Sequence, residues 1–324
     1  MIIKNIKELP IEEALGLHRE TYERAKKTIE ALPPFEQVED RVKASLSYLV
    51  DKGIGLFYVD QDQVVAYIVG YRVPQLFGKD PGVYVPLQGF GVLETKADYY
   101  TQKLYDAVAA HWVEDKRLTH SISLFATDPA MITTWFENGF GMRCVDGIRP
   151  VAPIHDSDKA TVPKDGCLEI RKVSKEDVAD MVPMFVAHLD HFGLAPIFMG
   201  KTIEDPLADR QAFMDEDQAH MWIAYEGDQA VGYLHGGAEG ETYVSLHESV
   251  LNINGAYVPE THRGRGIMEA LLERAMVDLK DLGYTRCGVD YESINPSANR
   301  FWRKYFTPYT HSLVRRIDDR FLKE

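Results

Sequence analysis

The sequence is poor in cysteine and in positive charge, and it contains no long apolar run. Its 324 residues include three cysteines, Cys144, Cys167 and Cys287, whose spacing matches neither a disulfide framework nor a zinc site. No stretch reaches the roughly 18 apolar residues of a membrane span, and the N-terminus lacks a basic segment followed by an apolar one. The sequence therefore predicts a cytoplasmic protein without a membrane segment or a bound metal.

The charge balance argues against two classes of partner. Asp and Glu number 50 against 36 Lys and Arg, which gives a formal net charge of −14. Nucleic acids and anionic membranes both need a positive protein face, so we expect neither as a partner. Hydrophobic residues make up 45% of the chain and charged residues 27%, as in folded soluble proteins. At about 100 to 200 residues per domain, the length predicts two domains.

The two halves of the chain resemble each other at an offset of about 167 residues. Residues 62–68 match residues 228–234 as a hairpin with polar residues at its tip. Residues 128–135 match residues 295–302, each run pairing an Asx-Pro start with a tryptophan at its end. Because these matches occur in the same order at nearly one offset, they indicate a duplication.

Each copy is expected to run as strand, helices, hairpin, long strand, helix, strand, helix and strand. This order predicts an α/β (α+β) fold of two tandem domains, each a mixed, mostly antiparallel sheet flanked by helices. The run 151–167 is polar and rich in Pro, Asp and Lys, which is typical of a linker. We therefore expect a first domain at 1–150, a linker at 151–167 and a second domain at 168–324.

One turn in the second copy has the pattern of an anion site. An apolar strand is expected at 251–258, and an apolar-periodic helix begins after a turn with two glycines, Gly264 and Gly266. Such a turn directs successive backbone N–H groups toward an anion, and the helix dipole adds a favourable field. A pyrophosphate fits such a turn.

This turn resembles the acyl-CoA signature of the GNAT superfamily of N-acetyltransferases, Arg/Gln-x-x-Gly-x-Gly/Ala, with Arg263 and Gly266 matching and Met268 departing. Further on, Asn295 and the residues to Phe306 resemble the superfamily pattern Asn-x-x-Ala-x-x-Leu-Tyr-x-Lys-x-Gly-Phe. The resemblance covers about 168–318, and it identifies the protein as a tandem GNAT-like chain with a degenerate first copy.

The resemblance implies that the second copy uses acetyl-CoA as a cosubstrate, without a metal, and transfers the acetyl group directly to a small-molecule amine. It implies that the strand residues pair with pantetheine and that the turn holds the pyrophosphate. The residues expected to contact acetyl-CoA are Ala256, Tyr257, Val258, Arg263, Gly264, Arg265, Gly266, Ile267, Met268, Asn295 and Trp302.

The catalytic acid and base are less clearly marked. Trp302 stands where the family usually has a tyrosine that protonates the departing thiolate, and an indole cannot serve as that acid. Tyr305 is the substitute that we favour, with packing beside Phe306 as the competing interpretation. For the base, Asp290 interrupts an apolar strand, where burial raises a carboxyl pKa, with a solvent-exposed carboxylate at the strand end as the competing interpretation. Glu248, Glu292 and His247 remain open for that role.

The first copy departs at the corresponding loop. Residues 88–94 form a longer loop that includes Glu94, and the first basic residue after it is Lys96. A pyrophosphate there meets a carboxylate with little compensating charge. We therefore expect no CoA site in the first copy and a structural or substrate-shaping role for it.

Three further interpretations stay open. His188 and His191 are spaced as a weak metal pair, although a pocket or surface role is favoured without a third ligand. The chain could instead be a non-catalytic acyl-CoA-binding regulator, or a tandem transferase that takes amino acids from charged tRNA, which its charge of −14 disfavours. The sequence leaves homo-oligomer formation undecided.

Overall fold

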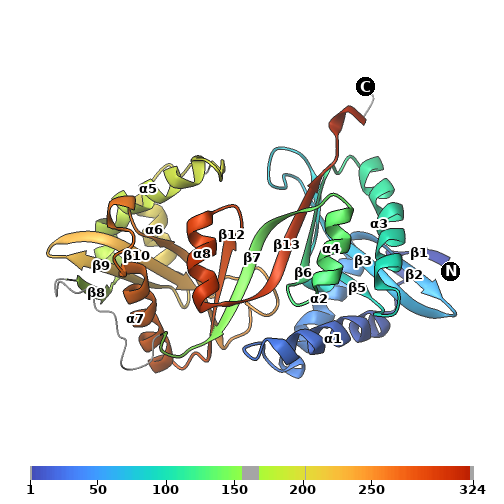
Figure 1. Cartoon of the computed structure of the whole chain (residues 1–324), viewed down its shortest axis with the longest axis horizontal. Coiled ribbons are helices and arrows are strands. Elements are labelled where there is room, and N and C mark those ends of the chain that lie inside the picture. Colours follow the sequence, from blue (N-terminus) through green and yellow to red (C-terminus); the bar gives the residue numbers. More distant parts are fainter. Residues whose placement is uncertain (1, 155–167, 201, 322–324) are drawn as a thin grey trace. The chain divides into compact units, whose positions relative to one another are not determined.

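The computed structural model describes residues 2–154, 168–200 and 202–321, and the chain forms two compact units. The N-terminal unit comprises residues 1–146, 242–244 and 308–324, and the C-terminal unit comprises 147–241 and 245–307. Figure 1 labels their elements. Most of the predicted linker, 155–167 including Cys167, lies outside the described residues.

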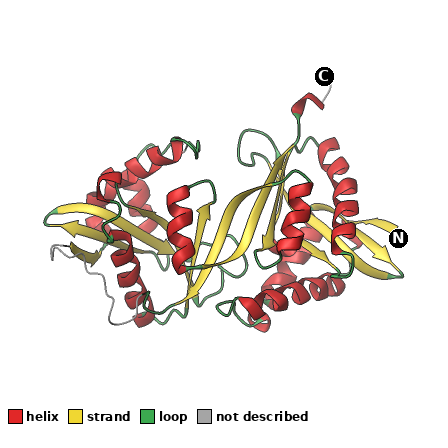
Figure 2. Ribbon diagram, viewed as in Figure 1, coloured by secondary structure: helices red, strands yellow, loops and turns green. Residues whose placement is uncertain are grey.

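The N-terminal unit is a mixed sheet flanked by helices (Figure 2). Its strands are ordered β1-β2-β3-β4-β6-β13, and β5 pairs with β3. The β4–β6 pair is parallel, and the other pairs are antiparallel. Its elements are β1 (Ile2–Asn5), α1 (Ile11–Thr28), α2 (Glu39–Lys52), β2 (Ile54–Asp60), β3 (Gln63–Val73), β4 (Gly82–Val85), β5 (Phe90–Val92), α3 (Ala97–Glu114), β6 (Thr119–Phe125) and α4 (Pro129–Glu137), with β13 (Thr307–Arg316) from the chain's end.

The C-terminal unit repeats this order of elements. Its strands are ordered β12-β11-β10-β9-β8, of which β11 and β12 are parallel. Its elements are β8 (Leu168–Lys172), α5 (Val182–Gly193), α6 (Pro206–Met214), β9 (His220–Glu226), β10 (Gln229–Gly237), β11 (Val250–Tyr257), α7 (Ile267–Asp281), β12 (Arg286–Glu292) and α8 (Pro296–Tyr305). The predicted fold class is thus confirmed, and each predicted hairpin is present as β2–β3 or β9–β10.

The last strand of each copy departs from the predicted domain boundaries. Residues 308–316 of β13 lie in the N-terminal unit and pair antiparallel with β6 from Thr310–Phe125 to Arg316–Thr119. Strand β7 (Gly141–Pro150) ends in the C-terminal unit, where Gly147 approaches Phe306 and Val289. Residues 141–146 of β7 belong to the N-terminal unit and residues 147–150 to the C-terminal unit, so β7 is divided between the two units. The domain boundary at 151–167 stays a prediction.

Each unit has its own apolar core. In the N-terminal unit, Trp112, Trp135 and Tyr105 pack edge to face between α3, α4 and the sheet. In the C-terminal unit, Met181, Met221 and Ile223 are fully buried beside β10. Burial of each large apolar side chain contributes roughly 1.5 to 3 kcal/mol, so these cores are a main source of stability for the two units.

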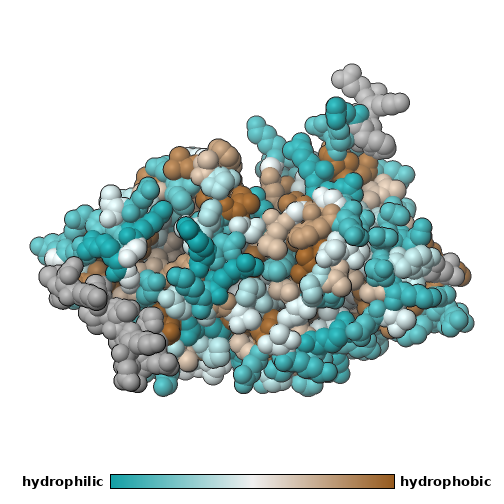
Figure 3. Space-filling model, viewed as in Figure 1, coloured by the Kyte–Doolittle hydropathy of each residue, from teal (hydrophilic) through white to brown (hydrophobic). Residues whose placement is uncertain are grey.

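The surface is mixed in character. On the face shown in Figure 3, hydrophilic side chains predominate, and a hydrophobic patch lies over α5 and the segment after it. Val186, Leu194 and Phe198 supply exposed apolar surface in this segment. Within the described ranges, no helix is both long and apolar enough to cross a membrane.

Candidate functional site

The turn between β11 and α7 has the geometry that the sequence predicts. After a short 3-10 helix at Glu260–His262, Gly264 and Gly266 both adopt positive φ, +77° and +80°. Gly266 is the N-cap of α7, which begins at Ile267. A left-handed backbone costs other residues about 1 kcal/mol or more, which accounts for glycine at both positions. The turn therefore presents a helix N-terminus with backbone N–H groups for an anion.

The two arginines of the turn are both engaged at the surface. Arg263 donates from Nε to the carbonyl of Val258 at 3.0 Å, and its guanidinium lies 5.7 Å from the centre of the Tyr257 ring. Arg265 pairs with Glu226 at 2.5 Å, with 42% of its side chain exposed. Because exposed ion pairs contribute little, the Glu226 pair can give way to an anion at low cost.

Strands β11 and β12 separate beside this turn. Their last parallel pair is Ile253 with Val289, whereas β11 stays paired with β10 as far as Tyr257 and Tyr233. The end of β11, which contains Ala256, thus diverges from β12. Such an opening between parallel strands at their carboxyl ends is a place where a ligand can pair with the backbone.

A bulge sets the direction of β11 at the opening. The β10–β11 register shifts between His235, which pairs with Gly255, and Gly236, which pairs with Ile253, so Asn254 is the extra residue of the bulge. A Cβ on Gly255 would lie 2.2 Å from Nε2 of His235, so only glycine fits there. The bulge lies next to the predicted pantetheine-binding residues and re-aims their backbone groups.

Two of the predicted acyl-CoA contacts have structural roles. The Asn295 side chain caps α8 by accepting from the backbone N–H of Ser297 at 3.2 Å and of Ala298 at 3.3 Å. Trp302 is 6% exposed and packs between Phe301 and Phe306. A contact of either residue with acyl-CoA stays a prediction. Of the turn residues, Ile267 is buried at 2% exposure and Met268 is partly exposed.

Asp290 follows the last pair of β12 and lies at the opening. The residue is exposed, so the burial expected from the sequence is not observed. Desolvation of its carboxyl group by neighbouring protein atoms still raises its pKa to about 6, and the charges of Glu241 and Glu292 add to the shift. A carboxyl group that titrates near neutral pH can exchange protons with a substrate.

Tyr305 lies against the first turn of α7. Its hydroxyl donates to Oε1 of Glu269 at 3.5 Å, and Glu269 is in that turn. Desolvation, with Glu269 as the next cause, raises the pKa of Tyr305. The hydroxyl therefore stays protonated near neutral pH, as a proton donor must.

The sequence spacing of His188 and His191 favours a pocket or surface role over a metal pair, and the structure places both histidines of α5 beside Tyr257 at the end of β11. His188 bonds through Nδ1 to the Tyr233 hydroxyl at 2.7 Å and stacks on Tyr257 at 5.0 Å. Burial lowers the pKa of His188 to about 4. Across the described ranges, no group of three or more His, Cys, Asp or Glu side chains could hold a metal.

His191 is the residue that sequence reasoning undervalued. Its pKa is lowered, first by desolvation and then by the charge of Arg263, while a bond with Asn295 opposes the shift. Its Nε2 atom is buried and has no hydrogen-bond partner within the described part of the chain. The i, i+3 spacing of His188 and His191 indicates that the two side chains lie near each other. The surface that they face is known only from the contacts of His191 with Tyr257 and Asn295.

Comparisons with known proteins give one family match and several structures with a similar fold. Residues 190–306 match the Acetyltransferase (GNAT) family. A GCN5-related N-acetyltransferase from Sphaerobacter thermophilus has a similar structure, with a TM-score of 0.57, 15% identity, and coverage of 97% of this chain and 95% of that one. A tandem GNAT protein from the clavulanic acid biosynthesis pathway, solved without AcCoA, gives a TM-score of 0.51, 13% identity, and coverage of 97% and 98%. No curated protein matches the sequence.

Proposed function

We propose that the C-terminal unit, which holds residues 190–306 of the GNAT match apart from 242–244, transfers an acetyl group from acetyl-CoA to a small-molecule amine. The observation that carries the proposal is the turn at Gly264 and Gly266, which joins the diverging end of β11 to the N-terminus of α7. The exposed end of β11 is followed directly by an anion site at the turn. This arrangement suits a ligand that has a pantetheine arm and a pyrophosphate.

The turn binds the pyrophosphate of the cosubstrate, and the end of β11 binds its pantetheine arm. The pyrophosphate takes hydrogen bonds from the backbone of 264–268 and charge from Arg263 and Arg265. The amides of pantetheine pair with the backbone of Ala256, Tyr257 and Val258, where β12 no longer occupies the edge. This arrangement carries the thioester toward the β11 bulge at Asn254, next to Gly255, and toward Asp290.

The reaction is a direct transfer within a ternary complex. The amine nitrogen attacks the thioester carbonyl carbon, a C–N bond forms, and the C–S bond breaks to release the CoA thiolate. Holding both reactants in place removes much of the entropic cost of their encounter, and a backbone N–H of β11 stabilises the oxyanion.

Asp290 accepts the proton that the ammonium group loses. With its pKa near 6, the carboxyl group is ionised at pH 7 and still basic enough to take a proton. Tyr305, through its hydroxyl, or a water molecule returns a proton to the thiolate. A thiol has an ordinary pKa of about 8.5, so the thiolate is a tolerable leaving group even without a dedicated acid.

Two alternatives differ from this function in a measurable way. An acyl-CoA-binding regulator uses the same turn without turnover, and a buried Trp302 in the family's tyrosine position favours that alternative. A transferase that uses charged tRNA needs a positive face, which the net charge of −14 disfavours. We propose a cytoplasmic enzyme, and whether it forms a homo-oligomer stays open.

Amine-dependent release of free CoA thiol tests the proposal. The full-length protein is incubated with acetyl-CoA and a panel of small amines, and products are identified by a mass increase of one acetyl group. We expect thiol release with at least one amine class. Acetyl-CoA binding without any amine-dependent release would favour the regulator, and absence of binding would contradict both.

A further inference from the structure

The two arginines of the β11–α7 turn differ in what holds them. The Arg265 guanidinium pairs with Glu226, a carboxylate that competes with any anion for it. Arg263 donates from Nε to the Val258 carbonyl at 3.0 Å, and within the described part of the chain no carboxylate pairs with it. The two terminal NH2 groups of Arg263 are therefore available to a phosphate, which guanidinium groups bind well.

The Tyr257 ring lies beside the Arg263 guanidinium, whose central carbon is 5.7 Å from the ring centre. A cation within about 6 Å of an aromatic ring is attracted by the quadrupole of the ring. Together with the Val258 carbonyl, the ring restricts an arginine that is otherwise exposed. A long side chain that is already held in one position loses less conformational entropy when it binds a ligand.

Helix α5 fixes the Tyr257 ring in turn. The His188 ring stacks on it, with 5.0 Å between the centroids and an interplanar angle of 21°. The Nδ1 atom of His188 bonds with the hydroxyl of Tyr233, a fully buried residue of β10, at 2.7 Å. Because burial lowers the pKa of His188 to about 4, its imidazole is neutral at pH 7 and does not repel the Arg263 guanidinium.

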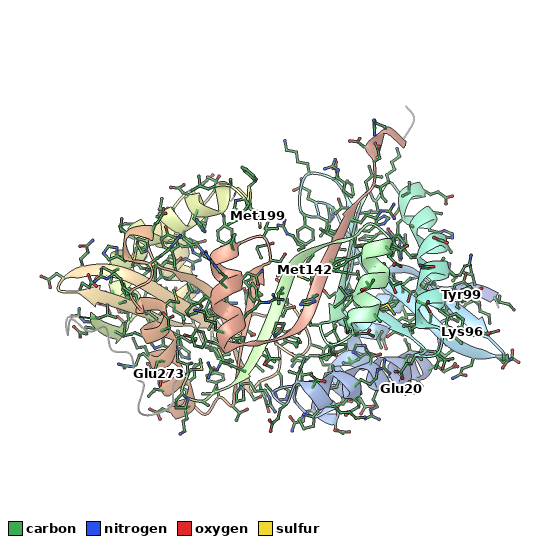
Figure 4. The ribbon with its side chains drawn as sticks, viewed as in Figure 1. Glu20, Lys96, Tyr99, Met142, Met199 and Glu273 are labelled. Carbon is green, nitrogen blue, oxygen red and sulfur yellow. The ribbon has the colours of Figure 1, made fainter. Side chains whose placement is uncertain are left out.

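The C-terminal end of α5 is held as well. The backbone N–H of Met199, labelled in Figure 4, donates to the carbonyl of Phe192 at 2.7 Å, so the segment after α5 folds back on the helix. The Phe192 ring lies 5.0 Å from that of His188. A row of four side chains thus runs from the buried strand β10 to the turn, and we call it the Tyr257 stack: Tyr233, His188, Tyr257 and Arg263.

We propose that the side chain of Tyr257 is a positioning residue, which holds the Arg263 guanidinium in place for the pyrophosphate before acetyl-CoA arrives and is itself held by His188 of α5. The observation that carries the proposal is the unbroken succession of a hydrogen-bonded imidazole, a stacked ring and a guanidinium fixed at Nε. This role is separate from the pairing of the Tyr257 backbone with pantetheine. It rests on the proposed function, because it requires that Arg263 binds the pyrophosphate.

A double-mutant cycle tests the positioning by calorimetric titration of acetyl-CoA into the full-length protein. Tyr257→Leu should weaken acetyl-CoA binding about twofold to fivefold, the range of a cation–π contact at an exposed site. Tyr257→Phe keeps the ring and should restore most of that affinity. In the Arg263→Ala background, Tyr257→Leu should cause no further loss, because the guanidinium that the ring positions is absent.

Tyr284→Leu is the matched control, since Tyr284 is half-buried like Tyr257 but follows the C-terminal end of α7. It should bind acetyl-CoA as the parent does. If Tyr257→Leu weakens binding equally with and without Arg263, or Tyr257→Phe restores nothing, the positioning role is overturned. Failure of the parent to bind acetyl-CoA overturns the proposed function together with this role, and so differs from a failure of the positioning alone.

A measurement on the ligand-free protein examines the positioning directly. The Nε–H signal of Arg263 in a 1H–15N NMR spectrum is identified by its loss in Arg263→Ala. Because Nε donates to the Val258 carbonyl beside the ring, Tyr257→Leu should shift this signal and accelerate its exchange with water. Tyr257→Phe should keep the exchange slow. A signal that is identical in the parent and in Tyr257→Leu overturns the inference.

Discussion

The hydroxyl of Ser121 donates a hydrogen bond at 3.0 Å to the carbonyl of Leu313, 192 residues later in the chain. Leu313 is fully buried in the core of the N-terminal unit, although the repeat assigns it to the second copy. Strand β13 therefore contributes to the first unit's core.

This relationship predicts that Leu313→Ala destabilises the N-terminal unit. Loss of a buried leucine leaves a cavity and costs about 2 to 5 kcal/mol. We expect hydrogen exchange to accelerate in β6, which pairs with β13, and the urea midpoint of the protein to fall. Leu282→Ala, at a side chain that is 49% exposed after α7, should change stability by less than about 0.5 kcal/mol. Faster exchange confined to 168–307 would contradict the placement of β13 in the N-terminal unit.

Arg263→Ala should weaken acetyl-CoA binding by about 1 to 3 kcal/mol, because it removes a charge-assisted contact to the pyrophosphate. Calorimetric titration measures the loss. Pantetheine derivatives without pyrophosphate should bind the variant and the parent equally. Arg274→Ala is the control, since Arg274 is an exposed arginine on α7 that pairs with Asp278. An equal loss for the pyrophosphate-free ligands would place Arg263 elsewhere in the site.

Asp290→Asn should lower kcat by about two orders of magnitude, the usual contribution of a general base. In the parent protein, activity should rise as pH increases through about 6, because only the ionised carboxyl group accepts a proton. A pH–rate profile of both proteins tests this. If Glu248→Gln abolished activity while Asp290→Asn kept a normal kcat, Glu248 and not Asp290 would be the general base.

The same raised pKa has a consequence for stability. Since the folded-state pKa of Asp290 lies above its usual value of 3.8, the native protein binds the proton more tightly than the unfolded chain between those two values. The contribution of this group to stability is present below pH 3.8 and is lost as pH rises through about 6. Above that pH range, the Asp290→Asn variant should therefore gain stability relative to the parent protein, compared with the same difference at low pH.

Tyr305→Phe should lower kcat with little change in KM if the tyrosine hydroxyl protonates the thiolate. Loss of its bond to Glu269, at 3.5 Å, should cost little stability because that bond is long. Trp302→Tyr should retain or improve activity, since it restores a hydroxyl at the family position. An unchanged kcat for Tyr305→Phe across the pH range would leave water as the donor.

The sequence was sufficient to predict the fold class and the glycine turn. Residues 62–68 and 228–234 mark the same hairpin twice, and the turn at Gly264 and Gly266 is a local feature that needs positive φ. Local patterns of this kind can be predicted from the sequence because each requires one of only a few residue types.

The sequence could not show which unit holds β13, or what surrounds His191. An alternating strand reads the same in either sheet, so nothing in 307–316 identifies β6 as its partner. The partners of His191, Tyr257 and Asn295, lie 66 and 104 residues away in the chain. The Tyr257 stack is equally non-local, because residues of α5, β10, β11 and the turn after it build it.

The most direct test of the central claim is calorimetric titration of acetyl-CoA into Gly266→Ala and Gly283→Ala. Both glycines have positive φ, +80° and +86°, and a Cβ at either meets nothing within 4 Å, so the two variants should lose similar stability. Gly266 is the N-cap of α7, whereas Gly283 follows its C-terminus. We predict binding of one acetyl-CoA per chain to the parent and to Gly283→Ala, and binding at least tenfold weaker to Gly266→Ala. Equal affinity of the two variants, or two equivalent sites per chain, would contradict the account.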